Sequence, residues 1–167
     1  MSISTWTSTP RSPRNDRASG SRRSEAVAEP PYDPNLITPS VYGDRRPVTG
    51  EIVALLHITF EDRNLELIPS RSRGLRRNEI HELMITDEED VRPGGGADRV
   101  SAIAFFEVME GGLAVVGDKV SIGGRPLGRV AGYDMTHMPN HMNVLVKSET
   151  LDAGPLEVGD TIEISKT

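Results

Sequence analysis

Short apolar segments alternate with polar ones along the chain from residue 47 onward. Residues 52–60 are too rich in apolar and β-branched side chains for a solvated loop and too short for a typical helix, which predicts a central β-strand. Residues 64–68 alternate apolar and polar side chains and stop before Pro69, so they predict a second strand, a candidate partner for the first. Residues 99–110 repeat the dense apolar pattern and predict a third.

The segment 71–84 is ambiguous between helix and strand. Its apolar residues lie approximately at helical spacing, which predicts one short helix. A strand over residues 79–86 is the alternative interpretation, because Gly74 weakens the start of such a helix. The acidic and glycine-rich residues that follow predict a long polar loop.

The tripeptide V-G-D, followed by alternating apolar and polar residues, occurs twice, in segments 116–122 and 158–164. Glycine adopts backbone conformations that other residues avoid, and aspartate can accept hydrogen bonds from nearby amides. Each copy therefore predicts a turn that leads into a strand. The residues expected to point into the core are Val120, Ile122, Ile162 and Ile164.

The remaining pattern favours an all-β domain. Gly123-Gly124 predicts a hairpin turn, and residues 142–148 predict a further strand. Many short strands, abundant glycine and few helical stretches predict a mainly β fold, a small β-barrel or sandwich with at most one or two short helices. We place this small β-barrel domain at residues 47–167.

The residues before the domain differ in composition. Residues 1–29 are mainly Ser, Thr, Arg, Pro and Ala, and their few apolar side chains cannot offset the entropy lost on ordering, which predicts a disordered N-terminal tail. Residues 30–46 contain several prolines, which favour extended and turn conformations. We interpret this segment as a Pro-rich arm that tethers the tail to the domain.

Charge and composition restrict the partners. The chain of 167 residues has a formal charge of −6; the tail holds five arginines against Asp16, Glu25 and Glu29, so it carries +2 and the remainder −8. An acidic domain repels phosphate backbones, which argues against nucleic acid as the main ligand. The apolar runs fall short of the roughly 20 residues that cross a bilayer, and no apolar signal core follows the N-terminus, so we expect a cytoplasmic location. The chain has no cysteine, which excludes disulfides and thiolate metal sites.

One polar stretch, GYDMTHMPNHMNVLV at residues 132–146, concentrates residue types that bind metals. Asp134, His137 and His141 offer a carboxylate and two imidazoles, which suit zinc, iron or another divalent ion. His57, in the first predicted strand, joins this predicted metal set if closure of a barrel brings it near. The alternative is a structural loop, because His, Asn, Asp and Pro also pre-form turns.

Further candidates surround this stretch. His137 and His141 are also candidate catalytic residues, together with Glu107, whose carboxyl group lies among large apolar neighbours and is a candidate general acid or base. For Glu107 the alternative is a position on the solvent-facing side of its strand. The candidate ligand-binding residues are Tyr133, Asn140 and Asn143.

The dipeptide His81-Glu82 begins a zinc-protease motif but does not complete it. The second histidine of that motif is required four residues after the first, where this chain has Ile85. We therefore interpret His81 as a surface residue of the predicted helix.

The order VGDKVSIGGRPLGRVAGYD, a polar loop, NHMNVLVK and LEVGDTIEI resembles the sorbitol/glucitol-specific IIA component of the bacterial sugar phosphotransferase system over residues 103–164. The resemblance implies a small β-barrel. In that family a histidine upstream of the first G-D turn is phosphorylated, and Phe105 stands at or near its place here, so phosphoryl transfer is not expected. The GYDxTHxPNH region also resembles an uncharacterised group of actinobacterial proteins, which implies no activity.

Together these patterns predict a small β-barrel that binds a small molecule through the loop 134–141, with zinc or iron as the expected cofactor, and an enzyme of specialised metabolism as one form of this function. The alternative is a non-catalytic interaction or regulatory module on a phosphotransferase-IIA-like barrel, in which the tail or an exposed strand edge contacts a partner. The sequence is compatible with a monomer and with a homo-oligomer.

Overall fold

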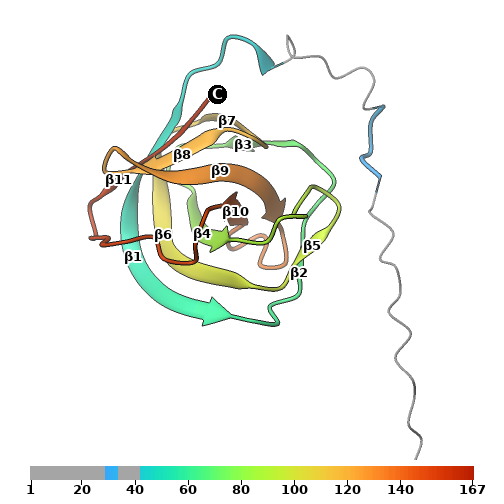
Figure 1. The fold of residues 1–167 in the computed structure, drawn as a ribbon. Helices are drawn as coiled ribbons and strands as arrows, with labels where there is room; N and C mark the ends of the chain where they lie inside the picture. The colour runs from blue at the N-terminus through green and yellow to red at the C-terminus, as the bar shows by residue number, and fades with distance from the viewer. Residues whose placement is uncertain (1–28, 34–41) are drawn as a thin grey trace, which may run out of the picture.

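The computed structural model describes residues 29–33 and 42–167, which contain eleven β-strands and no α-helix (Figure 1). The mainly β fold is thereby confirmed, whereas most of the predicted tail and part of the arm, residues 1–28 and 34–41, lie outside the described residues. No helix in the described part of the chain has the length and hydropathy needed to span a bilayer. The strands are β1 (Val48–Phe60), β2 (Leu65–Glu66), β3 (Ser72–Leu75), β4 (Ile80–Thr86), β5 (Gly96–Ala97), β6 (Val100–Glu110), β7 (Gly112–Val115), β8 (Lys119–Ile122), β9 (Arg125–Asp134), β10 (Asn143–Lys147) and β11 (Thr161–Ser165).

Seven strands close into a barrel in the order β1-β11-β8-β9-β10-β4-β6. Neighbouring strands in this ring are antiparallel, except β4 and β10, which run parallel with Asn143 opposite Glu82. Parallel strands begin at the same end of a sheet. The start of β4 and the loop that leads into β10 therefore lie side by side at one end of the barrel.

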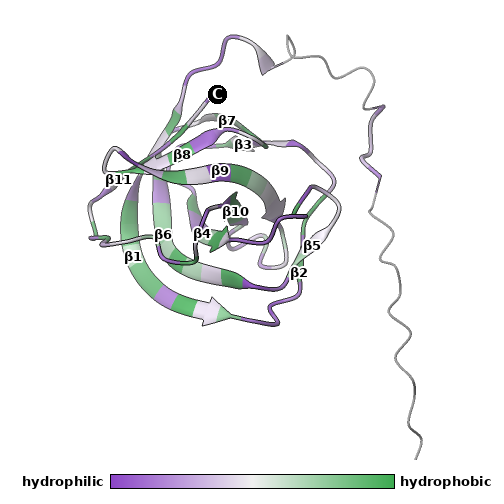
Figure 2. Ribbon diagram, viewed as in Figure 1, coloured by the Kyte–Doolittle hydropathy of each residue, from purple (hydrophilic) through white to green (hydrophobic). Residues whose placement is uncertain are grey.

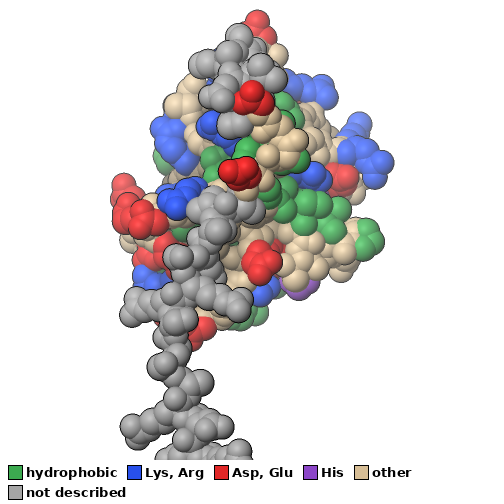
Figure 3. Space-filling view, turned by 90° about the vertical axis from the view of Figure 1, so that its right-hand side faces the viewer, with side chains coloured by type: hydrophobic (Ala, Val, Ile, Leu, Met, Phe, Trp, Pro, Cys, Tyr) green, Lys and Arg blue, Asp and Glu red, His purple; other side chains and the backbone are tan. Residues whose placement is uncertain are grey.

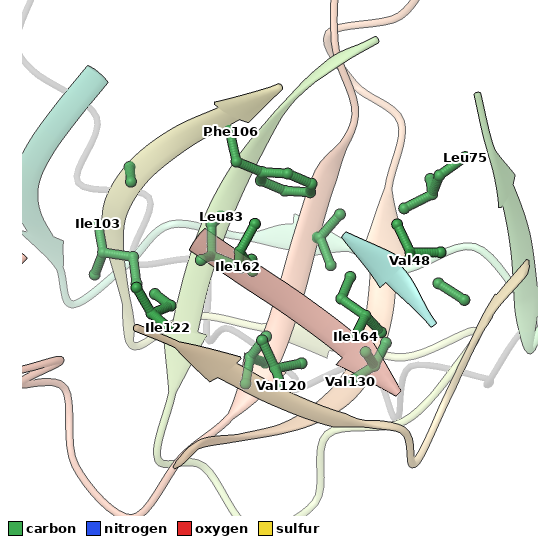
Figure 4. Close-up of a cluster of buried hydrophobic side chains, with 14 of the residues drawn as sticks. Val48, Leu75, Leu83, Ile103, Phe106, Val120, Ile122, Val130, Ile162 and Ile164 are labelled. Atoms are coloured by element: carbon green, nitrogen blue, oxygen red, sulfur yellow. The ribbon is translucent and has the colours of Figure 1, made fainter. Parts of the chain in front are cut away.

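Apolar side chains from all seven strands fill the barrel interior, where Phe106 of β6 is completely buried (Figure 4). Figure 2 shows the same division along the chain, with hydrophobic residues in the strands and hydrophilic residues in the connections. The four residues predicted to point inward are each at most 2% exposed, which confirms the prediction. They are Val120, Ile122, Ile162 and Ile164.

A second apolar cluster covers the outer face of β4 and β10, beneath the ladder that β2 forms with β5. Met84 and Leu145 belong to this outer cluster, whereas their neighbours Leu83 and Val144 belong to the interior. A strand that is buried on both faces has a continuous apolar run without alternation. The helix predicted over residues 71–84 is therefore wrong. β4 (Ile80–Thr86) confirms the alternative of a strand over residues 79–86, and β3 (Ser72–Leu75) was predicted by neither interpretation.

The ladder of β2 and β5 differs from the prediction in its pairing. Residues 64–68 contribute β2, which pairs with β5 from the predicted polar loop, not with β1. Leu67 packs tightly on β9 at Gly132, where a Cβ atom would lie only 2.9 Å from Leu67 Cδ1. The glycine thus permits the close approach that seats this ladder on the barrel.

The two V-G-D segments form the same turn, as predicted. Gly117 and Gly159 both have φ of +97°, in the region that favours glycine. In each copy the aspartate closes the turn: Oδ2 of Asp118 and of Asp160 accepts the N–H of the residue three positions earlier, at 2.8 Å and 2.9 Å. The turns lead directly into β8 and β11, and these two strands pair with each other.

Arg45 attaches the segment that precedes β1 to the barrel. Its guanidinium donates to both carboxylate oxygens of Asp118 and, at 2.9 Å, to the carbonyl oxygen of Leu113. The side chains of Arg45 and Asp118 are only 12% and 4% exposed. Removing one partner of a buried ion pair leaves the other charge without compensation.

We expect Arg45→Ala to lower the free energy of unfolding by about 3 kcal/mol. In this variant the Asp118 carboxylate stays buried in the V-G-D turn, and its negative charge has no cation to compensate it. Arg46→Ala is the matched control, since the exposed Arg46 side chain donates only to the carbonyl oxygen of Gly111. Its expected loss is below about 1 kcal/mol. Urea denaturation of both variants measures the difference, and equal losses would show that the ion pair does not anchor this segment.

Candidate metal centre

The loop between β9 and β10 presents His137 and His141 at the end of the barrel where β4 begins. Within the loop, the N–H of Met138 donates to the carbonyl oxygen of Met135 at 3.0 Å, and the N–H of Asn140 donates to that of His137 at 2.9 Å. The N–H of Glu82 then donates to the carbonyl oxygen of Met142 at 3.0 Å, which continues the parallel ladder of β4 and β10 to the base of the loop.

Asp134, the last residue of β9, fixes the start of this loop and is only 1% exposed. Its Oδ1 accepts hydrogen bonds from the N–H of Thr136 and from Nδ2 of Asn143, each at 3.1 Å. Its Oδ2 accepts from the N–H of Glu66 at 3.1 Å and from the Thr136 hydroxyl at 3.0 Å. Four donors thus occupy the carboxylate, which joins β2, β9 and β10.

Glu82, His137 and His141 form one compact group of potential metal ligands, whose donor atoms lie within 4.8 Å of one another. His141 Nε2 is 3.3 Å from Glu82 Oε2, and these two side chains are 15% and 11% exposed. The His137 and His141 rings stack with their centroids 4.9 Å apart, and Phe105 of β6 meets the His141 ring edge to face at 5.1 Å. Aromatic packing and the barrel wall therefore orient the two imidazoles.

Arg63 contacts the same group from the segment between β1 and β2. Its Nη2 lies 3.3 Å from His137 Nε2, and its guanidinium carbon lies 5.5 Å from the centre of the Phe60 ring. Because arginine can only donate, Nε2 of His137 is the acceptor, and the ring N–H is on Nδ1. In the absence of a metal, Arg63 thus occupies the lone pair of His137.

His81 supports the group from the interior side of β4. The Met142 N–H donates to His81 Nδ1 at 3.3 Å, so the ring proton is on Nε2, which lies 3.3 Å from Glu79 Oε2. Burial lowers the pKa of His81, and the contact with Glu79 opposes this shift only in part. The neutral imidazole thereby joins β4 to the residue that follows His141.

A groove of about 550 Å³ borders the metal-ligand group at His141, the one member of the group that lines it. Its apolar wall consists of Ile80, Phe105, Met138 and Pro139, and its polar lining includes Arg76, Glu79, Asn140 and His141. A larger groove, of about 720 Å³, lies along β2 and β5, but no histidine lines it. A third groove, of about 590 Å³ near Lys147, has no histidine either. Among these grooves of the described residues, the one of 550 Å³ is therefore the one that borders a candidate metal ligand.

The structure brings together two of the four predicted metal ligands. His137 and His141 lie in the group, whereas the Asp134 carboxylate is occupied by its four donors. His57 is exposed on β1, at a register shift where its own φ is +56°, and it lies outside the group. Glu82 takes the place that the prediction gave to Asp134.

The other candidate residues are distributed over three environments. Asn140 lines the groove, as expected of a ligand-binding residue. Tyr133 is completely buried in the barrel interior, and Asn143 is completely buried beside Asp134, so neither side chain reaches the groove. Glu107 is partly buried on β6, opposite Glu51 and Ile80, and lies outside the metal-ligand group.

Glu82 was not among the predicted site residues, because the preferred interpretation of its segment was a helix with the neighbouring His81 on its surface. In the strand, His81 is 6% exposed and Glu82 is 9% exposed. A glutamate directly before the apolar run of residues 83–85 was the available signal, since buried carboxylates are rare unless they have a partner.

We expect Asp134→Asn to lower the free energy of unfolding of the metal-free protein by about 2 kcal/mol or more, because the amide nitrogen would face groups that donate. Asp152→Asn is the control, since Asp152 closes only an exposed turn through the N–H of Gly154. Thermal unfolding in the presence of a chelator measures both variants. Unchanged stability of Asp134→Asn would contradict the structural role given to this carboxylate.

The lowered pKa of His81 predicts acid sensitivity of the metal-free protein. Between the ordinary value of 6.5 and the lower folded value, the unfolded chain binds more protons than the folded one, so stability falls as the pH falls. For one proton the slope is at most about 1.4 kcal/mol per pH unit. His81→Gln, which keeps an acceptor for Met142, is expected to show a smaller slope in urea titrations between about pH 7 and pH 5. An unchanged slope would assign the sensitivity to other groups.

Comparison with known proteins yields one match. No curated protein and no solved structure matches the chain, so the resemblance to the sugar phosphotransferase IIA component gains no support. The model of a family of unknown function, DUF6917, matches residues 42–165, a range that holds the whole barrel together with Glu82, His137 and His141. This agrees with the expectation of an uncharacterised family. The chain belongs to the DUF6917 family.

Proposed function

We propose that this protein binds one divalent transition-metal ion through Glu82, His137 and His141 and presents it to a small molecule in the adjoining groove. The observation that carries the proposal is the convergence of two imidazoles and one carboxylate from the β9–β10 loop and β4. This ligand set suits zinc and non-haem iron(II). Two of the chain's four histidines would then bind the ion at one end of the barrel.

The distances within the group support such a site. Two ligands that bind a tetrahedral ion at about 2.0–2.1 Å are separated by roughly 3.3 Å. His141 Nε2 and Glu82 Oε2 already lie 3.3 Å apart. His137 is on an exposed loop, and an adjustment on the order of 1 Å would bring its ring to the same ion.

Three protein ligands leave part of the coordination sphere open. A zinc ion keeps one position for water or substrate in this arrangement, and an octahedral ion keeps more. The bound ion would then polarise a carbonyl group or lower the pKa of a bound water molecule, which are the steps that an enzyme of specialised metabolism would use. Glu107 has no part in this proposal, because it lies outside the group.

The surface favours a small ligand over a nucleic acid. Figure 3 shows acidic and basic side chains interspersed over one face of the molecule, without a continuous basic patch. The closed ring of seven strands also leaves the barrel without a free edge at which a partner strand could add. The alternative function as an interaction module would therefore depend on the short outer ladders or on the tail, which lies outside the described residues.

We expect the purified full chain to bind one equivalent of Zn²⁺ or Co²⁺ after removal of adventitious metal by a chelator. Glu82→Gln, His137→Ala and His141→Ala are each expected to weaken the affinity by more than about 100-fold, since even residues behind the ligands commonly contribute 10–100-fold. Isothermal titration calorimetry and elemental analysis after dialysis measure affinity and stoichiometry.

His57→Ala is the matched control, because it removes an exposed histidine outside the group. Its metal affinity should equal that of the wild type. Absence of stoichiometric binding, or an equal loss in His57→Ala and His141→Ala, would contradict the proposed site.

A further inference from the structure

Arg63 is a cation beside the metal-ligand group, and no carboxylate of the described residues forms a salt bridge with it. Its guanidinium contacts His137 Nε2 at 3.3 Å and lies over the Phe60 ring. The contact with His137 is its one side-chain hydrogen bond within the described residues, so most of its five N–H donors have no acceptor in this part of the chain.

Binding of a metal must release Arg63 from this contact. A neutral imidazole has one lone pair, on whichever nitrogen does not carry the proton. If His137 binds the ion through Nε2, this lone pair is used; if it binds through Nδ1, the proton moves to Nε2. In both cases Nε2 can no longer accept from Arg63, and the guanidinium is left without an acceptor beside the new ion.

The loaded site would carry excess positive charge. A divalent ion with one carboxylate ligand, Glu82, retains one positive charge, and Arg63 adds a second. Guanidinium groups bind carboxylates through two parallel hydrogen bonds, and open metal positions also accept carboxylate oxygens. An anion that contacts both the ion and Arg63 would satisfy the two groups at once.

The groove next to the ion determines the rest of the ligand. Ile80 and Met138 are 46% and 42% exposed there, and Phe105 and Pro139 continue the apolar wall. Large apolar side chains that remain open to solvent gain free energy when an apolar group covers them. The ligand should therefore combine an anionic end with an apolar body.

We propose that the metal-loaded site binds a small organic acid, whose carboxylate bridges the metal ion and Arg63 while its apolar part lies in the groove along Phe105. This inference rests on the proposed metal site and adds a substrate class to it. Metal and acid then bind in order, because the metal-free protein keeps Arg63 on His137. By linkage, the acid in turn raises the affinity for the metal.

The test uses the full chain loaded with Co²⁺, whose visible absorption reports on its ligands, and benzoate as the probe. Benzoate is expected to change the Co²⁺ spectrum with a saturable, one-to-one dependence. Acetate, which lacks an apolar body, and benzamide, which lacks the charge, should each bind at least about tenfold more weakly. If benzamide binds as tightly as benzoate, the ligand does not need an anionic end. If acetate binds as tightly as benzoate, the groove does not contribute to binding.

Arg63→Gln separates a role in ligand binding from a structural role. This variant should bind Co²⁺ at least as tightly as the wild type, because a competitor for His137 is lost, yet bind benzoate at least about tenfold more weakly. Arg71→Gln, which removes an exposed arginine just before β3, should match the wild type in both titrations. An unchanged benzoate affinity in Arg63→Gln would overturn the inference.

The two proposals fail differently in this experiment. If no Co²⁺ spectrum with nitrogen and carboxylate ligands appears, the metal site and the acid site are both wrong. If Co²⁺ binds through Glu82 and the two histidines but benzoate leaves its spectrum unchanged, only the organic-acid inference is overturned.

Discussion

The parallel pairing of β4 with β10 is the constraint on which both the barrel and its candidate metal site depend. This pair closes the ring of seven strands, in which all other neighbouring strands are antiparallel. Its register places Asn143 opposite Glu82. Because both strands begin at the same end, the loop before β10 must lie against the start of β4. A slip of one residue would turn Glu82 from the outer face to the interior and would separate it from His141.

Two buried polar contacts keep this register at the site. Asp134 holds the beginning of the loop to β2 and to Asn143, and His81 receives the Met142 N–H at its end. Each contact uses a side chain with the required acceptor, and each would leave a buried group unpaired if the loop moved. The two histidines between these anchors are thus restricted in position although the loop itself is exposed. Such support from neighbouring residues is what a preformed ligand site requires.

Sequence patterns predicted the strands that have one solvated face. In β8 and β11 the apolar residues alternate with polar ones, and the V-G-D turns mark where each strand begins, so Val120 and Ile162 were placed correctly in the core. The prediction was ambiguous for β4, because its apolar residues lack alternation and, together with Leu75, also fit helical spacing. The strands β6 and β10, which are likewise buried on both faces, were predicted because their apolar runs are too dense for a loop and are not compatible with helical spacing alone. Because β4 was assigned to a helix, Glu82 was also not recognised as a candidate metal ligand.

The candidate site could be predicted only in part, for a related reason. His137 and His141 are close in sequence, so local composition identified them, whereas Glu82 joins them only through a pairing of distant strands. Asp134 has the right chemistry for a metal ligand, but backbone and side-chain donors occupy its oxygens, which residue type alone does not reveal. The prediction that His57 is a metal ligand required barrel closure to bring it near the loop. The barrel is closed, but His57 is exposed and lies outside the group.

Strand pairing in this barrel is what would create the proposed metal site from Glu82, His137 and His141. A crystal structure of the full chain grown with Zn²⁺, with anomalous differences measured at the zinc absorption edge, tests it most directly. We expect one strong peak at about 2.0–2.1 Å from a Glu82 carboxylate oxygen and one nitrogen of each histidine. A peak elsewhere, for example on the acidic residues 87–90, with none between Glu82 and His141, would contradict it.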